Sequence, residues 1–286
     1  MGILSKDMIE KWILPQLPIG TRGFETRVPL IEIVECILYR LKTGCQWREL
    51  PTKEFFSRNA LHWNTVYYYF SKWSKADCWK KVWLHILANN LKYLDLSSIE
   101  LDGSHTRCKN GGDAVGYQGR KAAKTTSALF VSDNQGVMLA MSTPQEGQHH
   151  DLFQIQLLFE QICLLLKQAG INLKGLFLNA DPAFDSVEFD IACQKEDIIA
   201  NVKPNPRNSM GQNAATENKK AYQTRTHIFD DELYRDRTVI EHANAWLDGF
   251  KALLIRFECS INNWMSLHFI AFSVIFLRKI KQKTKV

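Results

Sequence analysis

The spacing of apolar residues changes near residue 98, and this change constrains the fold more than any other feature. Before it, apolar side chains recur every three or four residues, as at Leu30, Val34 and Leu41, which is the period of a helix. After it, apolar and polar residues alternate over 99–102, as in a half-buried strand. The change predicts a helical region, 1–95, followed by an α/β region, 96–286.

The first region is expected to hold helices at 28–41, 57–73 and 78–94, with a short element at 47–51. Gly44 is expected to end the first helix, because glycine suits the left-handed cap. This order of elements is a helix, a turn, a short helix and then a long helix rich in basic and aromatic residues. It is typical of a helix-turn-helix-like DNA-binding domain. A plain helical bundle with an aromatic core would show the same pattern.

The sequence pattern of the second region predicts an α/β fold with a mixed sheet. The expected order of elements is βββαβαβ, followed by two helices. The expected strands are 99–102, 127–131, 137–141, 175–178 and 198–202. The expected helices are 151–169, with Asp151 as its N-cap, 186–196, 237–250 and 261–281. Residues 203–232 are polar and rich in Pro, Asn and Lys, which indicates a loop or small insertion.

Charge is unevenly distributed around a formal net value of +6. Residues 1–95 hold 14 Lys/Arg against 9 Asp/Glu, and residues 278–286 hold five basic residues and no acid. The remaining residues, 96–277, carry more acidic than basic side chains. This pattern favours DNA-binding flanks around a carboxylate-based site, although chance unevenness would look similar.

The seven cysteines are scattered and form no C-x-x-C motif. This spacing argues against a disulfide framework and a zinc site, and it favours a reducing cytosol. The amino terminus lacks a basic segment followed by an apolar run, and the longest apolar run, 269–277, is short for a membrane helix. We therefore expect a cytoplasmic protein with no membrane partner.

Three acidic residues stand out by position. Asp102 and Asp181 end or directly follow predicted strands, where α/β sheets bind ligands, and Glu241 lies in a predicted helix. Three convergent carboxylates suit Mg²⁺ or Mn²⁺, and two such ions can act on a phosphodiester. Alternatively, Asp102 and Asp181 begin ordinary turns, and Glu241 pairs with Arg237. Asp185 is a rival to Asp181.

The segment Tyr234-x-x-Arg237-x-x-x-Glu241 resembles the Y-(2)-R-(3)-E signature of bacterial insertion-sequence transposases with a DDE catalytic core. Other blocks resemble the same family in the same order. They are 37–51, similar to its helical DNA-end-binding region; 100–112 and 178–186, similar to the blocks with the two aspartates; and 116–136 and 234–258. The match is to the "insertion sequence five" type.

The resemblance implies an RNase H-like catalytic core over about 96–286, preceded by the helix-turn-helix-like domain. It implies that Asp102, Asp181 and Glu241 are catalytic and hold Mg²⁺ or Mn²⁺, as two ions. The expected reaction is hydrolysis at the element's terminal inverted repeats, followed by joining of the 3′-hydroxyl to target DNA. The expected partner is double-stranded DNA bound by a homodimer at the bacterial nucleoid, with no nucleotide cofactor.

Several residues are candidates for contacts with DNA. Arg237 lies one helical turn before Glu241 and can reach a phosphate, and Tyr234 lies a further turn back, where packing is an equal alternative. The family's signature lysine is replaced by Asp248, so Lys251 is the nearest substitute. The remaining candidates are Arg107, Lys109, Arg120, Lys121 and Lys124, together with His105.

Two other readings stay open at this point. The chain can be a catalytically inactive relative that only binds DNA, or an RNase H-like nuclease that recognises branched DNA. The three acids favour an active enzyme, and the helical region favours recognition of specific ends. A metal site at residues 149–151 is disfavoured, because no matching Cys or His partner is evident.

Overall fold

The computed structural model describes residues 2–18, 28–57, 60–205 and 229–284. They fall into two compact units. The helical unit comprises 1–89, 106–115 and 245–286, and the sheet unit comprises 90–105 and 116–244. A division into domains at 1–95 and 96–286 stays a prediction.

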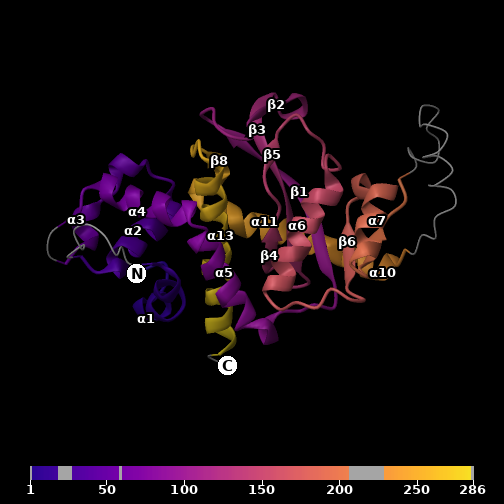
Figure 1. The fold of residues 1–286 in the computed structure, drawn as a ribbon, viewed down its shortest axis with the longest axis horizontal. Helices are drawn as coiled ribbons and strands as arrows, with labels where there is room; N and C mark the ends of the chain where they lie inside the picture. Colours follow the sequence, from indigo (N-terminus) through magenta and orange to yellow (C-terminus); the bar gives the residue numbers. More distant parts are fainter. Residues whose placement is uncertain (1, 19–27, 58–59, 206–228, 285–286) are drawn as a thin grey trace. The chain divides into compact units, whose positions relative to one another are not determined.

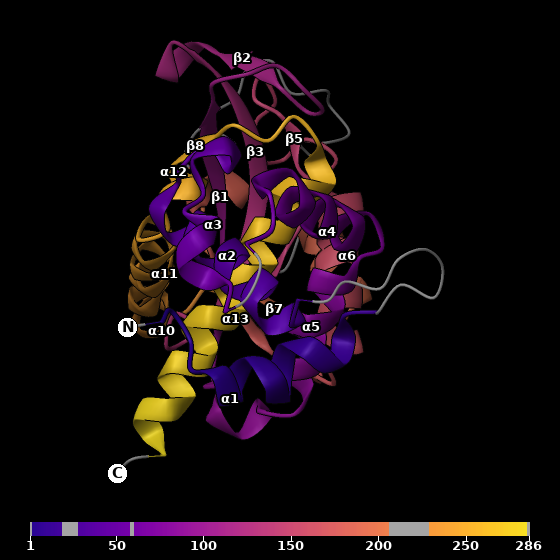
Figure 2. The same cartoon turned by 90° about the vertical axis from the view of Figure 1, so that its left-hand side faces the viewer.

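The helical unit is built around its longest helix. Helix α13 (Ile261–Lys283) packs against α5 (Cys78–Ala88) and α4 (Trp63–Lys75), as Figure 2 shows. Trp83 of α5 is fully buried, with its ring centroid 5.7 Å from Phe272 and 6.0 Å from Phe276 of α13. The other α-helices of this unit are α1 (Lys6–Met8), α2 (Leu30–Thr43), α3 (Thr52–Phe55) and α12 (Lys251–Leu254).

The predicted helices of this region are present, with shifted ends. Gly44 closes α2 in the left-handed conformation, with φ 68°, as expected. The prediction that α4 begins at 57 is wrong: it begins at Trp63, because His62 has an extended backbone and its Nδ1 accepts a hydrogen bond from the Asn64 amide. Helix α5 ends at Ala88, before the short 3₁₀ turn Leu91–Tyr93.

The sheet has the order β2-β3-β1-β6-β7, with β4 and β5 on β3 and β8 on the far end of β1. Strands β1, β6 and β7 are parallel, whereas β2, β4 and β5 run antiparallel to β3, so the predicted mixed sheet is confirmed. The strands are β1 (Ile99–Cys108), β2 (Gly116–Gln118), β3 (Ala123–Asp133), β4 (Met138–Met141), β5 (Gln145–Glu146), β6 (Phe177–Ala180), β7 (Ile199–Val202) and β8 (Ile255–Arg256).

The helices of the sheet unit follow the strands (Figure 1). Helix α6 (Ile155–Gln168) packs on β4 and on α7 (Val187–Lys195). The segment after β7 forms α10 (Asp231–Tyr234), a 3₁₀ turn (Arg235–Thr238) and α11 (Val239–Asp248). Most of the predicted polar loop, 206–228, lies outside the described residues. Within the described ranges, no helix is long and apolar enough to span a membrane.

Candidate active site

The register of two parallel strands places Asp102 and Asp181 at the same level. In the pairing of β1 with β6, Glu100 lies opposite Asn179 and Leu101 opposite Ala180. Asp102 and Asp181 are the next residues along these strands. Asp181 also begins a 3₁₀ turn, since its Oδ1 accepts a hydrogen bond from the Ala183 amide at 2.8 Å. The turn expected before Pro182 is therefore present alongside the strand-end position.

Arg237 connects two of the three predicted acids. Its Nη1 lies 3.8 Å from Asp181 Oδ2, and its Nη2 lies 3.8 Å from Glu241 Oε1. Both distances exceed hydrogen-bonding range, and the Asp181 and Glu241 side chains are 43% and 63% exposed. Exposed ion pairs of this kind contribute about 0–1 kcal/mol. A stronger cation or a phosphate can therefore displace the guanidinium from either carboxylate.

A buried polar ladder begins two residue pairs before the two aspartates, at Glu100 and Asn179. Asn179 Nδ2 donates to Glu100 Oε1 at 3.1 Å, and Asn201 Nδ2 donates to Asn179 Oδ1 at 2.7 Å. The same amides also bond the segment before α11, since Asn179 Nδ2 donates to Leu233 O and Asn201 Nδ2 to Asp230 O, both at 3.0 Å. The ladder therefore fixes the start of the segment that carries Glu241 against the strands that carry the aspartates.

Asp102 is the most buried of the three predicted acids. Its Oδ2 accepts a hydrogen bond from Asn244 Nδ2 at 3.3 Å, and Asn244 lies three residues after Glu241 on α11. Burial, followed by the charge of Asp151, raises the pKa of Asp102 to about 6. A cation beside Asp102 would reverse this effect, because it would stabilise the ionised carboxylate.

Asp151 is a fourth carboxylate at this position. The prediction that it caps a helix is wrong, because Gln154, at φ 54°, directly precedes α6. Asp151 lies instead against Gly103, where an added Cβ would come within 2.3 Å of Asp151 Oδ1. That oxygen is buried and has no hydrogen-bond partner among the described residues. Burial raises the pKa of Asp151 as well.

The donor chemistry fits a divalent ion. Among the described residues, no three His, Cys, Asp or Glu side chains lie close enough together to form a metal site as they stand. However, carboxylate oxygens are the preferred ligands of Mg²⁺, Asp151 Oδ1 lacks a partner, and the Arg237 guanidinium already lies between Asp181 and Glu241 as a cation would. The residues therefore fit the ion, provided that Arg237 moves.

The His-His-Asp sequence does not act as a metal trio here. The ring of His149 stacks on Phe153 with centroids 3.6 Å apart, and His150 Nδ1 accepts a hydrogen bond from the Leu152 amide. His105, in turn, lies within hydrogen-bonding range of Thr125, with its Nδ1 3.2 Å from the hydroxyl. These contacts orient β1, which carries Asp102, and the segment before α6, which carries Asp151.

Asp185 is not an alternative to Asp181. It is 2% exposed, and its Oδ2 accepts a hydrogen bond from the Asn205 amide at 2.6 Å. A carboxylate so enclosed by its own loop stabilises the turn after β6.

The predicted DNA contacts are accessible to different degrees. The candidates Arg107, Lys109, Arg120, Lys121, Lys124 and Lys251 are exposed. Lys251 begins α12, beyond the end of Glu241's helix at Asp248. Tyr234 is half-buried, with its ring 5.2 Å from that of Phe229 and 5.7 Å from the Arg237 guanidinium. Tyr234 therefore packs against Phe229 and Arg237.

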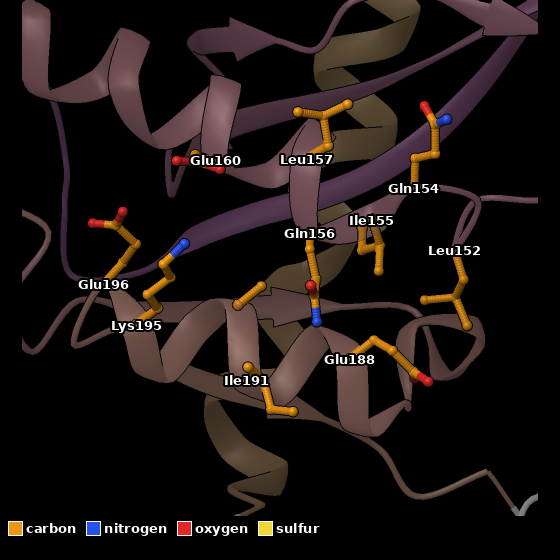
Figure 3. A pocket seen from close by; sticks show the side chains of 11 residues that line it. Leu152, Gln154, Ile155, Gln156, Leu157, Glu160, Glu188, Ile191, Lys195 and Glu196 are labelled. Carbon is orange, nitrogen blue, oxygen red and sulfur yellow. The ribbon is translucent and has the colours of Figure 1, made fainter. Parts of the chain in front are cut away.

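A hollow of about 660 Å³ lies elsewhere in the sheet unit, between α6 and α7. Figure 3 shows Gln156 of α6 extending toward Ile191 and Glu188 of α7. None of the three predicted acids lines this hollow. At the carboxylate site, the side chains of Asp181 and Glu241 are accessible to a large substrate, because they are 43% and 63% exposed.

Comparison with known families identifies the class of protein. Residues 101–274 match the family described as "DDE superfamily endonuclease", and the chain belongs to this family. Residues 7–83 match a second family, described as "Putative transposase of IS4/5 family". Together the two matches make this chain an insertion-sequence DDE transposase, as its motifs predicted. The predicted fold class, an α/β core with a mixed sheet preceded by a helical region, is confirmed.

Two solved structures are similar to the chain at low scores. The "Mos1 transposase paired-end complex with left transposon end" has a TM-score of 0.28 and 10% identity, and covers 94% of this chain and 84% of that one. The "Crystal structure of the Mos1 Strand Transfer Complex" has a TM-score of 0.26 and 12% identity, and covers 90% and 79%. At such scores neither structure bears on this site. Curated proteins gave no match.

Sequence reasoning missed the residues that support the acids. These are Glu100 and Asn179, two residues before Asp102 and Asp181, together with Asn201, Asn244 and Asp151. The available signal was a polar residue two positions before each aspartate, with an apolar residue on either side of it. Because side chains alternate across a strand, such residues share the face of the aspartate.

Proposed function

We propose that the enzyme cuts a DNA strand at the end of its element and then joins the freed end to target DNA. In the first step, water forms a bond to phosphorus, the bond from phosphorus to the bridging 3′-oxygen breaks, and a 3′-hydroxyl is left. In the second step, that 3′-oxygen attacks a target phosphorus and displaces the target's own 3′-oxygen. The number of P–O bonds is unchanged in the second step, so no ATP is required.

One observation carries the proposal: Asp102 of β1 and Asp181 directly after β6 lie level where the pairing of these parallel strands ends, and Arg237 lies between Asp181 and Glu241. Asp102, Asp181 and Glu241 would hold two Mg²⁺ or Mn²⁺ ions, with Asp151 as an additional oxygen donor beside Asp102. When bound, such ions activate the attacking oxygen and neutralise charge on the phosphate.

The other residues of the chain position DNA. Arg237 would release its carboxylates and bind a phosphate, which its planar guanidinium suits. Arg120, Lys121 and Lys124 on one loop, and Arg107, Lys109 and Lys251 elsewhere, would contact the backbone. Tyr234 would hold Arg237 in place by packing against it.

Joining requires two element ends, so we propose that a homodimer assembles on the terminal inverted repeats at the nucleoid. Light scattering with and without duplex DNA tests this part. A complex with one chain per DNA molecule under saturating conditions would contradict it.

A donor-plasmid assay tests the catalytic proposal. Purified protein is incubated with a supercoiled plasmid that carries the element's ends, with Mg²⁺, with Mn²⁺ or with EDTA. Wild type is expected to nick the plasmid only with a metal, and Asp181→Asn is expected to bind the ends without nicking them. Asp231→Asn is the matched control, because Asp231 is an exposed carboxylate paired only distantly, at 4.0 Å, with Arg235. Equal nicking by wild type and Asp181→Asn would refute the assignment.

A further inference from the structure

A pocket of about 940 Å³ lies within the helical unit and has aromatic and basic walls. One wall comprises Trp47 of the short turn after α2 and Trp63 and Tyr67 of α4. A second wall comprises Lys109 and the segment 257–260. We call this hollow the aromatic pocket. Its volume lies within the usual range for sites that enclose a small organic molecule.

Local structure holds the two walls in place. The ring of Trp47 packs against Tyr67, with centroids 5.2 Å apart and planes at 62°. Lys109 follows the pairing of β1 with β8, and its amide donates to Arg256 O at 2.9 Å. Asn110 Nδ2 donates to Phe257 O at 3.1 Å. Both walls are therefore tied down by bonds that do not depend on any ligand.

The floor of the pocket holds a buried guanidinium with unused donors. Arg40 is 3% exposed, and its Nη2 lies 3.3 Å from Glu258 Oε1, which also accepts a hydrogen bond from Trp47 Nε1 at 3.0 Å. Arg40 Nε and Nη1 have no hydrogen-bond partner within the described parts of the chain. A buried donor without a partner destabilises the folded protein by about 1–3 kcal/mol. A ligand with hydrogen-bond acceptors would therefore be stabilised beside Arg40.

The rim carries positive charge over exposed aromatic surface. The guanidinium carbon of Arg48 lies 5.7 Å from the Trp63 ring centroid, and both Arg48 and Lys109 are exposed. Trp63 and Tyr67 are half-buried, and Phe257 is 42% exposed. A planar ring between aromatic side chains, with an anion at the rim and acceptors at the floor, would satisfy all of these groups.

We propose that the aromatic pocket binds one unstacked nucleotide of a DNA strand. The base stacks on Trp63 and Tyr67, its acceptor atoms face Arg40, and its phosphate lies between Arg48 and Lys109. Stacking on aromatic rings combined with a basic track is how proteins hold unpaired strands, and arginine donors match the acceptors on base edges. The proposal rests on the DNA-binding part of the proposed function, and it adds recognition of an unpaired nucleotide.

Binding of full-length protein to a fluorescein-labelled twelve-residue oligothymidylate, followed by anisotropy, tests the proposal. Trp63→Ala is expected to weaken this binding roughly 5- to 150-fold, the range for loss of stacking. Trp63→Phe, which keeps a ring, is expected to bind within about threefold of wild type. Arg48→Gln is expected to weaken binding and to lower the salt dependence by about 0.7 in log–log slope, one phosphate on a single strand.

The matched control is Trp246→Ala. Trp246 is 44% exposed, and its ring lies 5.7 Å from Lys279 Nζ, so it repeats the pairing of an aromatic ring with a cation outside the aromatic pocket. It is expected to bind the oligonucleotide as wild type does. Circular dichroism establishes that each variant is folded.

Wild-type affinity in both Trp63→Ala and Arg48→Gln would overturn the proposal. So would a loss of self-association in sedimentation with unchanged oligonucleotide binding, because the pocket would then be an interface between copies. Plasmid nicking is measured in parallel. A wild type that binds the oligonucleotide through Trp63 yet never nicks DNA would refute the proposed reaction and leave the pocket standing.

Discussion

The guanidinium of Arg237 lies 3.8 Å from the carboxylate of Asp181, although 56 residues separate them in the chain. The same guanidinium lies equally far from Glu241. One side chain thus balances the charge of two proposed metal ligands, and it does so without hydrogen bonds. This arrangement predicts competition between Arg237 and a divalent ion.

Replacing Arg237 separates its role toward DNA from its role toward the carboxylates. We expect Arg237→Gln to lower plasmid nicking roughly 10- to 100-fold, because a charge-assisted hydrogen bond to phosphate is lost. We expect its Mn²⁺ affinity to equal or exceed that of wild type, because a competing cation is gone. Mn²⁺ binding followed by electron paramagnetic resonance measures this. Weaker Mn²⁺ binding would show that Arg237 supports the metal site.

Asp102 is expected to make stability depend on pH in the metal-free protein. Its pKa is about 6 in the folded chain and about 3.8 when exposed, so the folded state binds the extra proton and loses stability as pH rises from about 4 to 6. We expect Asp102→Asn to be more stable than wild type above pH 6, by of the order of 2–3 kcal/mol, and equal to it near pH 4. Urea unfolding with EDTA at pH 4.5, 6 and 8 measures the difference. A difference that does not change with pH would count against this reading.

Metal affinity is expected to depend on pH in the opposite direction. A carboxylate must lose its proton to bind Mg²⁺ or Mn²⁺. Mn²⁺ affinity of wild type is therefore expected to fall as pH drops below about 6, through the pKa of Asp102. Isothermal titration at pH 5 and pH 7.5 measures it, and equal affinities at the two values would exclude Asp102 as a ligand.

Adding a methyl group at Gly103, which contacts Asp151, tests whether Asp151 belongs to the proposed metal site. Gly103→Ala would place a Cβ within 2.3 Å of Asp151 Oδ1, so the carboxylate must move from beside Asp102. We expect Mn²⁺ affinity to fall roughly tenfold or more, the usual effect of disturbing the groups that support a metal site. Gly111→Ala is the control, since no heavy atom lies within 4 Å of an added Cβ there. Equal Mn²⁺ affinity in the two variants would remove Asp151 from the site.

The polar ladder is expected to act on catalysis through position. Asn179→Ala removes the donors to Glu100 and to Leu233 O, and we expect a loss of about 2–4 kcal/mol in the free energy of unfolding from the unpaired buried groups. Because Leu233 lies in α10, which leads into the helix that carries Glu241, nicking should also fall at temperatures where the variant is fully folded. Asn89→Ala, at an exposed amide bonded to its own helix, should change neither. Full activity of folded Asn179→Ala would reduce the ladder to a structural role.

Sequence reasoning reached the three acids because strand ends and helical spacing are local properties. Asp102 closes the alternating segment 99–102, Asp181 directly follows an apolar strand, and Arg237 and Glu241 are four residues apart. Their relation in space was out of reach, since it depends on the register of β1 against β6 over a separation of 79 residues. Asp151 was misassigned because it suited a helix cap, whereas Gln154 adopts the left-handed conformation that starts α6. The ladder was missed because its members pair only across strands.

The packing of Trp83 against Phe272 and Phe276 has a consequence for how the chain folds during its synthesis. A ribosome makes α5 long before α13, so the amino-terminal helices present an uncovered apolar face while the rest of the chain is translated. Their core closes only after the last helix has left the exit tunnel. A messenger RNA truncated before codon 261 therefore yields no DNA-binding fragment that folds on its own. It yields a product with exposed apolar surface, which chaperones and proteases remove.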